Sequence, residues 1–272
     1  MQRDIARELN RLVEAGEAFA LATVVQTQGP VPGKLGFQML VRADRSQLGT
    51  VGGAGLERQV HEACVEALAS GESRLLHFDL SYKKEGGLDS LCGGAVDIFV
   101  HAVPRKTHVL LVGGGHINYE VAKLCDQLDF LHSVLDDRAE FASAERFPYA
   151  AGRFVLAADA LGAPEAGFDP ARFTHAVVAG YSYKKDLAVL TWLLPRFAGH
   201  VGLIGSAFRK KEFHDRLRSA GVAEERLASM ECPVGLDLGA ETPAEIAVSI
   251  VAGLVRGESQ ARRDGRTSKP RA

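Results

Sequence analysis

The sequence lacks paired cysteines, long apolar runs and an excess of either charge. Its four cysteines lie far apart in 272 residues without a C-x-x-C pair, so we expect neither a disulfide framework nor a zinc site. No apolar stretch reaches the roughly 20 residues that span a bilayer. A net charge of −2 gives no broad basic field for nucleic acid or an anionic membrane. Because no apolar signal region follows Met1, we expect a soluble cytoplasmic protein.

A run of apolar residues at 109–112 stops at three glycines and continues with a helical pattern. This order is typical of a buried parallel strand that leads into the glycine-rich turn of a nucleotide-binding α/β fold. Gly113 suits the tight turn, and Gly115 suits the close approach of a pyrophosphate to the backbone at the helix start. Asn118 stands where the third glycine of G-x-G-x-x-G belongs, so the fingerprint is incomplete.

A second strand pattern, at 131–135, ends in Asp136 and Asp137. Asp136 follows Gly113 at about the 20-residue spacing at which an acidic residue binds a ribose hydroxyl in a dinucleotide fold. A solvated strand end is the alternative interpretation of the acidic pair. Further strand patterns follow at 155–158, 175–179 and 200–204.

Residues 104–106 are polar and include a proline, which indicates a domain boundary. An amphipathic helix pattern at 4–15 and several strand patterns precede it. We therefore predict an α/β protein. Its parts are an N-terminal mixed α/β domain at 1–103, a C-terminal Rossmann-like domain with a mostly parallel sheet at 107–257, and a disordered basic tail at 258–272.

Two more glycine turns can hold an anion. Gly52 and Gly53 lead into a helix pattern, where exposed N–H groups could cradle a phosphate, although close helix–sheet packing also requires glycine. Glu57 near that helix start could cap it or meet a cationic or hydroxyl-bearing group. Gly205 and Ser206 end a later strand pattern and offer phosphate ligands.

Cys92 stands on a loop directly before Gly93 and Gly94. Unpaired N–H groups or lysines nearby would lower the pKa of its thiol and so favour the thiolate. A thiolate attacks sulfur or binds a soft metal. Cys64 and Cys125 fall on apolar helix faces, so we interpret them as small buried hydrophobes. Residues 242–245 form a capping box with proline at the first helical position, which gives them a structural role.

Taken in order, these motifs resemble the XdhC/CoxI family of accessory proteins for molybdenum hydroxylases such as xanthine dehydrogenase. The stretches that carry the resemblance are 52–57, 92–94, 113–117, 136–148, 204–206 and 233–250. The resemblance implies a cofactor chaperone rather than an enzyme. It would bind the molybdenum cofactor, as molybdopterin or its cytosine dinucleotide form, while the molybdenum acquires a terminal sulfido ligand.

The resemblance also implies partners and further site residues. The partners are an apo molybdenum hydroxylase, of the xanthine dehydrogenase or aldehyde oxidoreductase type, and a cysteine desulfurase-like sulfur donor. A homodimer is left open. Cys92 becomes a thiolate ligand of the metal or a sulfur-relay group. The resemblance adds His116, Asp186, Gly235 and Asp237 to the cofactor-binding residues.

The chain departs from the family pattern at its anion contacts. The usual Thr-His-Asp is replaced by Gly180-Tyr181-Ser182, and Ala207 stands where an arginine is usual, with Arg209 shortly after it. These changes indicate a divergent subfamily.

Two other functions suit the same fold. Gly113, Gly115 and Asp136 also fit an NAD(P)-dependent oxidoreductase, although the sequence offers no clear acid–base pair for hydride chemistry. A sensor that binds a regulatory nucleotide is the third hypothesis.

Overall fold

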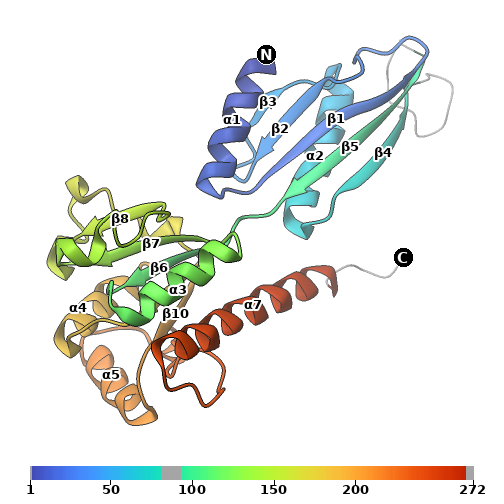
Figure 1. The fold of residues 1–272 in the computed structure, drawn as a ribbon. Coiled ribbons are helices and arrows are strands. Elements are labelled where there is room, and N and C mark those ends of the chain that lie inside the picture. The colour runs from blue at the N-terminus through green and yellow to red at the C-terminus, as the bar shows by residue number, and fades with distance from the viewer. Residues whose placement is uncertain (1, 81–92, 268–272) are drawn as a thin grey trace. The chain divides into compact units, whose positions relative to one another are not determined.

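The computed structural model describes residues 2–80 and 93–267. Its chain forms two compact units (Figure 1). The first contains the residues up to Lys106 together with those from Gln260 onward, and the second is Thr107–Ser259.

The first unit is built on a five-stranded antiparallel sheet in the order β3-β2-β1-β5-β4. Side chains alternate between its two faces, as the period of a strand requires. The strands are β1 (Phe19–Gln28), β2 (Gln38–Arg42), β3 (Gln47–Gly49), β4 (Arg74–Asp79) and β5 (Ala95–Val103).

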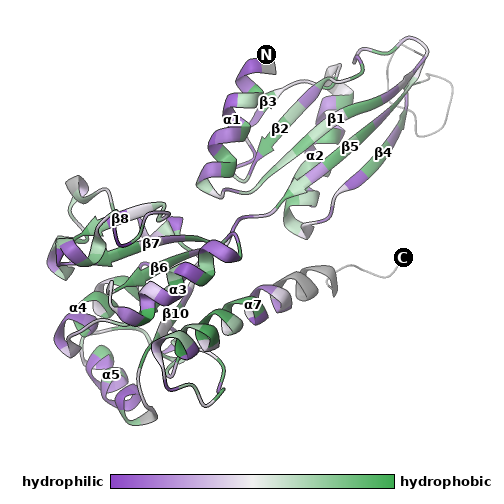
Figure 2. Cartoon of the chain, viewed as in Figure 1, coloured by the Kyte–Doolittle hydropathy of each residue, from purple (hydrophilic) through white to green (hydrophobic). Residues whose placement is uncertain are grey.

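One helix packs on each face of this sheet. Helix α1 (Gln2–Ala15) is amphipathic, with hydrophobic and hydrophilic residues along its length in Figure 2, and its Leu12 packs with Phe19 of β1. Helix α2 (Ala54–Ser70) packs against Ala20 and Ala22, which lie on the opposite side of β1 from Phe19 and its neighbour Leu21.

The second unit contains a five-stranded parallel sheet in the order β10-β9-β6-β7-β8. Counted from β6, this is the 3-2-1-4-5 order of a Rossmann fold, which confirms the predicted fold class. The strands are β6 (His108–Val112), β7 (Leu131–Asp136), β8 (Gly152–Val155), β9 (His175–Val178) and β10 (His200–Leu203).

The third strand of this sheet lies earlier than residues 155–158, where the sequence predicts it. β8 pairs with β7 from Ser133 opposite Gly152 to Asp136 opposite Val155. Because β7 ends at Asp136, its partner ends at Val155, and residues 158–160 form a 3-10 turn instead.

Helices cover both faces of the parallel sheet (Figure 1). On one face, α3 and α7 bury Val121, Cys125 and Ile250 against Val109 and Leu111. On the other face, α4 and α5 pack against the alternate residues of the same strands. The helices of this unit are α3 (His116–Gln127), α4 (Tyr183–Leu193), α5 (Ala207–Ser219), α6 (Glu224–Ala228) and α7 (Pro243–Thr267, whose end belongs to the first unit).

The start of α7 confirms the capping box. The carboxylate of Glu245 accepts hydrogen bonds from the N–H groups of Glu241 (2.9 Å) and Thr242 (3.0 Å), and Thr242 Oγ1 accepts from the Glu245 N–H. The helix continues to Thr267, beyond residue 257, where the sequence predicts a disordered tail. Glutamate, glutamine, alanine and arginine in this stretch favour a helix. Among the helices of the described residues, none is both long and apolar enough to cross a membrane.

Candidate functional site

The candidate site lies at the carboxyl edge of the parallel sheet, where an open α/β sheet binds its ligand. Turns that follow β6 and β9 meet at the point where the strand order reverses. The residues predicted for ligand binding in the second unit follow these strands or lie beside them. They are Gly113, Gly115, His116, Asp136, Asp137, Asp186, Gly205, Ser206, Gly235 and Asp237.

Each glycine of the turn after β6 has a different surrounding. Gly113 has a positive φ of 91° and lies against the backbone of residues 179–180. A Cβ on Gly114 would lie 1.8 Å from the carbonyl oxygen of Phe141. A Cβ on Gly115 would meet nothing within 4 Å. The first two glycines are therefore required by close packing, whereas Gly115 borders open space at the N-terminus of α3.

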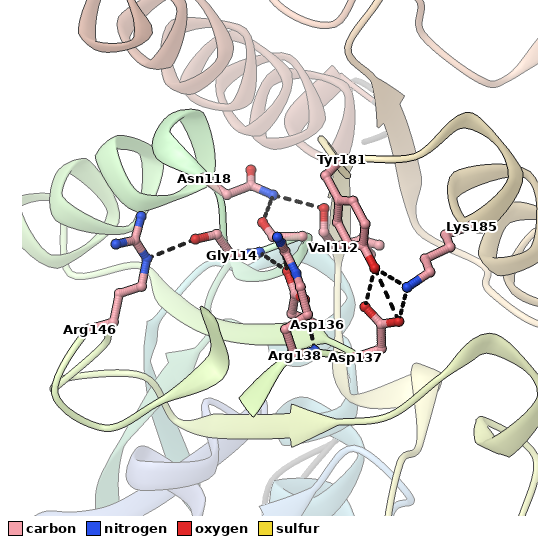
Figure 3. A network of polar contacts seen from close by, with 10 residues as sticks. Val112, Gly114, Asn118, Asp136, Asp137, Arg138, Arg146, Tyr181 and Lys185 are labelled. Carbon is pink, nitrogen blue, oxygen red and sulfur yellow. Dashed lines mark hydrogen bonds and ion pairs between the residues drawn. The ribbon is translucent and has the colours of Figure 1, made fainter. Parts of the chain in front are cut away.

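Asn118, in the place of the third fingerprint glycine, is fully buried. Its side-chain nitrogen lies 3.0 Å from the carbonyl oxygen of Val112 (Figure 3). The same nitrogen lies 2.8 Å from the carbonyl oxygen of Gly113 and 3.3 Å from that of Val177. The side chain thus joins helix α3 to the ends of β6 and β9. The Asn118 side chain therefore fixes the conformation of the turn, whereas a glycine at this position would make no such contacts.

Asp136 holds the other side of the turn. Its carboxylate accepts hydrogen bonds from Gly114 N–H (2.8 Å) and from Arg138 Nε (2.9 Å) and Nη2 (2.8 Å). Burial raises the pKa of Asp136, but the hydrogen bonds from Arg138 and Gly114 outweigh burial and lower it overall. Both carboxylate oxygens of Asp136 thus accept hydrogen bonds within the chain, and its contact with a ribose hydroxyl stays a prediction.

Two arginines flank the glycine turn. The guanidinium carbon of Arg138 lies 3.6 Å from the ring centre of Phe141 and 3.8 Å from that of Tyr181. Arg146 donates from Nε to the carbonyl oxygen of Gly114 at 2.8 Å (Figure 3). Its guanidinium carbon lies 5.4 Å from the ring centre of Phe141. Nη1 of Arg138 and both terminal nitrogens of Arg146 make no hydrogen bond within residues 2–80 and 93–267. These donors remain available for an anion.

Asp137, the second acidic residue, joins a separate cluster on the rim. It pairs with Lys185 Nζ and accepts a hydrogen bond of 3.1 Å from the hydroxyl of Tyr181, which also contacts Lys185 (Figure 3). Tyr181 is 53% exposed, so polar contacts at its hydroxyl and the stacked Arg138 rather than a core orient its ring.

Asp186 is buried at the start of α4 and lines a hollow of about 80 Å³ with mostly apolar walls. Its carboxylate lies 3.2 Å from Nη2 of Arg209 and also accepts a hydrogen bond from the Gly180 backbone. Burial raises the pKa of Asp186 to about 6, although Arg209 and the backbone bond act to lower it. Asp186 therefore holds its proton to a higher pH than an exposed aspartate does.

A second and larger hollow, of about 520 Å³, lies beside β10. Gly205, the loop at 233–240 and the first turns of α7 line it, and Gly235 and Asp237 belong to this loop. Ser206 caps α5, because its hydroxyl oxygen accepts from Arg209 N–H. The side chain of Arg209 packs on Gly205, which lines this hollow, and pairs with Asp186, which lines the smaller one.

The glycine turns predicted in the first unit lie near a single loop. Gly52, which has a positive φ of 144°, contacts the loop through Pro32 and Gly33, and Gly94 approaches the carbonyl oxygens of Gln28 and Pro30. Gly53 is the N-cap of α2, and Gly93 has a positive φ of 71°. Glu57, in the first turn of α2, accepts a hydrogen bond from Thr50. Cys92, which completes the predicted motif, lies outside the described residues.

The other three cysteines are free and buried, which confirms the prediction of a packing role for Cys64 and Cys125. Burial raises the pKa of each of these two thiols to about 12, so neither is a thiolate at neutral pH. In the described part of the chain, no group of three histidine, cysteine or acidic side chains is arranged to hold a metal ion.

The sequence patterns assign no role to four cationic or aromatic residues of the crevice: Arg138, Arg146, Tyr181 and Lys185. Arg138 stands two residues after Asp136, and Lys185 four residues after Tyr181, so their spacing was a usable local signal. Arg146 has no such signal, because its contact with Gly114 joins residues 32 positions apart.

The first unit is thus an antiparallel α/β domain, and the second is a Rossmann domain with cations around its glycine turn. The family model named XdhC Rossmann domain matches residues 109–254, and the model named XdhC and CoxI family matches residues 12–79. This chain belongs to the XdhC and CoxI family.

Two curated proteins are similar to this chain in sequence. An uncharacterized Escherichia coli (strain K12) protein, YqeB, is 33% identical over 95% of this chain and 47% of its own length. A Bacillus subtilis (strain 168) protein, named as a probable xanthine dehydrogenase subunit, is 32% identical over 59% of this chain and 46% of its own length. The chain thus spans about half the length of these relatives.

A solved structure shows the same fold. The crystal structure of a Bacillus halodurans protein described as a xanthine dehydrogenase matches with a TM-score of 0.51 and 19% identity. The match covers 97% of both chains.

Proposed function

We propose that this chain binds the molybdenum cofactor at its Rossmann crevice and delivers the sulfurated form to a molybdenum hydroxylase of the xanthine dehydrogenase or aldehyde oxidoreductase type. Family membership and the Bacillus subtilis relative, by its name a probable part of xanthine dehydrogenase, support the partner. In this proposal a cysteine desulfurase-like protein supplies the sulfur, and the chain is a cofactor chaperone rather than an enzyme.

The observation that carries the proposal is the pair of arginines beside the glycine turn. Arg138 and Arg146 have guanidinium N–H groups without partners in the described residues, and Gly115 leaves open space where α3 begins. An anionic group in that space would meet the helix N-terminus and two cations. The phosphate of molybdopterin and the diphosphate of its dinucleotide form fit such a site.

The residues also suit the rest of that cofactor. Tyr181 offers an exposed ring on which a flat heterocycle can stack, and the hollow beside Gly205 and Asp237 provides further space. The cofactor would supply a metal centre that must acquire a terminal sulfido ligand. We assign Cys92, which lies outside the described residues, the thiolate contact to that metal or the sulfur relay.

The crevice favours this ligand over a plain nicotinamide dinucleotide. Asp136 is engaged by Arg138 and Gly114, and Asp137 by Lys185 and Tyr181. A ribose diol would therefore compete with the Gly114 N–H for Asp136, and with Lys185 and Tyr181 for Asp137. An NAD(P)-dependent oxidoreductase remains the alternative, and the identity of the co-purified ligand distinguishes the two.

The test uses Gly115→Ala, which adds a methyl group to the open space without meeting another atom within 4 Å. Gly257→Ala in α7 is the matched control, because its Cβ also meets nothing within 4 Å. Both variants and the wild type are co-expressed with a molybdenum hydroxylase. Bound pterin and molybdenum are then measured in the purified proteins, together with the activity of the hydroxylase.

We expect wild type and Gly257→Ala to carry the cofactor and activate the hydroxylase. For Gly115→Ala we expect both the bound cofactor and the hydroxylase activity to fall by about tenfold or more. A Cys92→Ala variant should retain the pterin but fail to activate. Co-purification of NAD(H) or NADP(H) without pterin, or full activation by Gly115→Ala, would contradict the proposal.

A further inference from the structure

The side chain of Arg138 forms the middle layer of a three-layer stack. Its guanidinium carbon lies 3.6 Å from the ring centre of Phe141 and 3.8 Å from that of Tyr181. Two rings this close to one carbon cannot share a face of the guanidinium without overlapping, so they lie on opposite faces. The separation between Phe141 and Tyr181 is therefore that of two successive stacking contacts.

The space between the rings of Phe141 and Tyr181 is a slot, and each of these two walls is fixed by contacts outside it. The backbone of Phe141, in a 3-10 turn at Ala139–Ala142, lies against Gly114, which has no room for a Cβ. The hydroxyl of Tyr181 is held by Asp137 and Lys185. Since neither ring depends on Arg138 for these contacts, the slot can keep its width when the guanidinium moves.

The Arg138 side chain inside the slot is more exposed than the Asp136 carboxylate with which it pairs. The Arg138 side chain is 27% exposed, whereas the side chain of Asp136 is 1% exposed. Tyr181 and Asp136 also line the hollow that contains Asp186, so the slot and this hollow share a wall residue. A guanidinium is flat and stacks on aromatic faces in the way that a heterocyclic ring does.

We propose that the slot between Phe141 and Tyr181 is the binding site for one flat heterocycle of the ligand, a pterin or a nucleobase, which displaces the guanidinium of Arg138. This inference rests on the proposed function, because it assigns a ring of the same ligand. Displaced towards solvent, Arg138 keeps its charge at the rim of the crevice, where it faces phosphate groups of that ligand.

Displacement of the guanidinium by a ring predicts that one substitution affects two kinds of ligand to different extents. Arg138→Ala empties the slot, so a neutral ring no longer competes with the guanidinium and binds more tightly. The same change removes a cation that would contact phosphate. A phosphorylated ligand therefore gains less affinity from the substitution than a neutral ring does. Arg138→Lys keeps the charge but has no flat group to fill the slot, and should tighten the binding of both ligands.

The experiment titrates the full chain with pterin, adenosine and cytidine as neutral rings, and with cytidine diphosphate as a phosphorylated probe. Calorimetry gives the affinities, and quenching of pterin fluorescence reports stacking. For the neutral ring that occupies the slot, we expect about tenfold tighter binding to Arg138→Ala and Arg138→Lys than to wild type. Tyr181→Ala should lose that affinity, whereas Tyr181→Phe should retain it.

Each outcome decides the proposal. Tightening for pterin alone assigns the slot to the pterin, and tightening for the nucleosides alone assigns it to the nucleobase. Unchanged or weaker binding of every neutral ring in both Arg138 variants overturns it. If Arg138→Ala fails to fold because Asp136 has lost its partner, the ring affinities of Arg138→Lys test the proposal instead.

The slot and the proposed function can fail separately. Wild-type protein that carries the cofactor, with no effect of the Arg138 variants on ring binding, rejects the slot only. Tighter ring binding in these variants, with no pterin or molybdenum in the co-expressed wild type, supports the slot and rejects the function.

Discussion

The side-chain nitrogen of Asn118 lies 2.8 Å from the carbonyl oxygen of Gly113, so the residue that interrupts the glycine fingerprint also closes the turn. The same nitrogen reaches Val112 and Val177. Restoring the fingerprint with Asn118→Gly should therefore destabilise the domain. We expect a loss of about 2–4 kcal/mol, from the missing hydrogen bonds and from glycine inside a helix.

Urea unfolding measures this loss, and Lys123→Gly on the exposed side of the same helix is the control. Lys123 is 54% exposed, so its replacement reports mainly the helix cost of glycine, about 1 kcal/mol. Equal losses for the two variants would show that the contacts of Asn118 add no stability.

Adjacent glycines of the turn should respond in opposite ways to the same substitution. Gly114→Ala places a Cβ 1.8 Å from the carbonyl oxygen of Phe141, whereas Gly115→Ala meets nothing within 4 Å. We expect Gly114→Ala to lose about 1–3 kcal/mol, as overpacking does, and Gly115→Ala to stay within about 0.5 kcal/mol of wild type. Thermal and urea unfolding check both values, and similar stabilities of the two variants would contradict the packing seen at Gly114.

The sequence predicted the parts of the crevice that depend on local signals. Gly113 follows an apolar run and Asp136 ends the next strand pattern, so both could be placed at the carboxyl edge before any contact was known. The engagement of Asp136 could not, because it needs the turn after β6 folded against the end of β7. The bond from Tyr181 to Asp137 joins residues 44 positions apart, which no spacing rule anticipates.

Asp186 should make the protein less stable as the pH rises. Its pKa is raised to about 6 in the folded chain, from an ordinary value of 3.8, because burial disfavours the charge. Below the lower value both states hold the proton. Between the two values only the unfolded state releases it, so stability falls as the pH rises and levels off above about pH 6.

Asp186→Asn should remove this trend and be more stable than wild type at pH 7.5, by up to about 3 kcal/mol, with a difference that vanishes near pH 4. Urea unfolding at a series of pH values measures it. Arg209→Gln is the matched variant: it removes the cation that lowers the pKa, so the fall in stability should extend to higher pH. A constant difference between wild type and Asp186→Asn at all pH values would show that Asp186 does not titrate in this range.

His175 should have the opposite effect in the same range. Burial lowers its pKa to about 4, with a smaller contribution from His200, whose ring stacks on it at 5.3 Å. Because the unfolded histidine takes up a proton near pH 6.5 and the folded one only near pH 4, the stabilising effect is complete above 6.5 and is lost as the pH falls.

His175→Gln should therefore resist acid better than wild type, with a relative gain of up to about 3 kcal/mol between pH 6.5 and 4. His200→Gln removes a neighbouring charge that lowers the pKa of His175, so it should give a smaller gain of the same sign. Unfolding midpoints between pH 4 and 8 separate these effects from that of Asp186, since Asp186→Asn changes the stability difference with the opposite slope. An acid response of His175→Gln identical to that of wild type would assign the acid sensitivity to other groups.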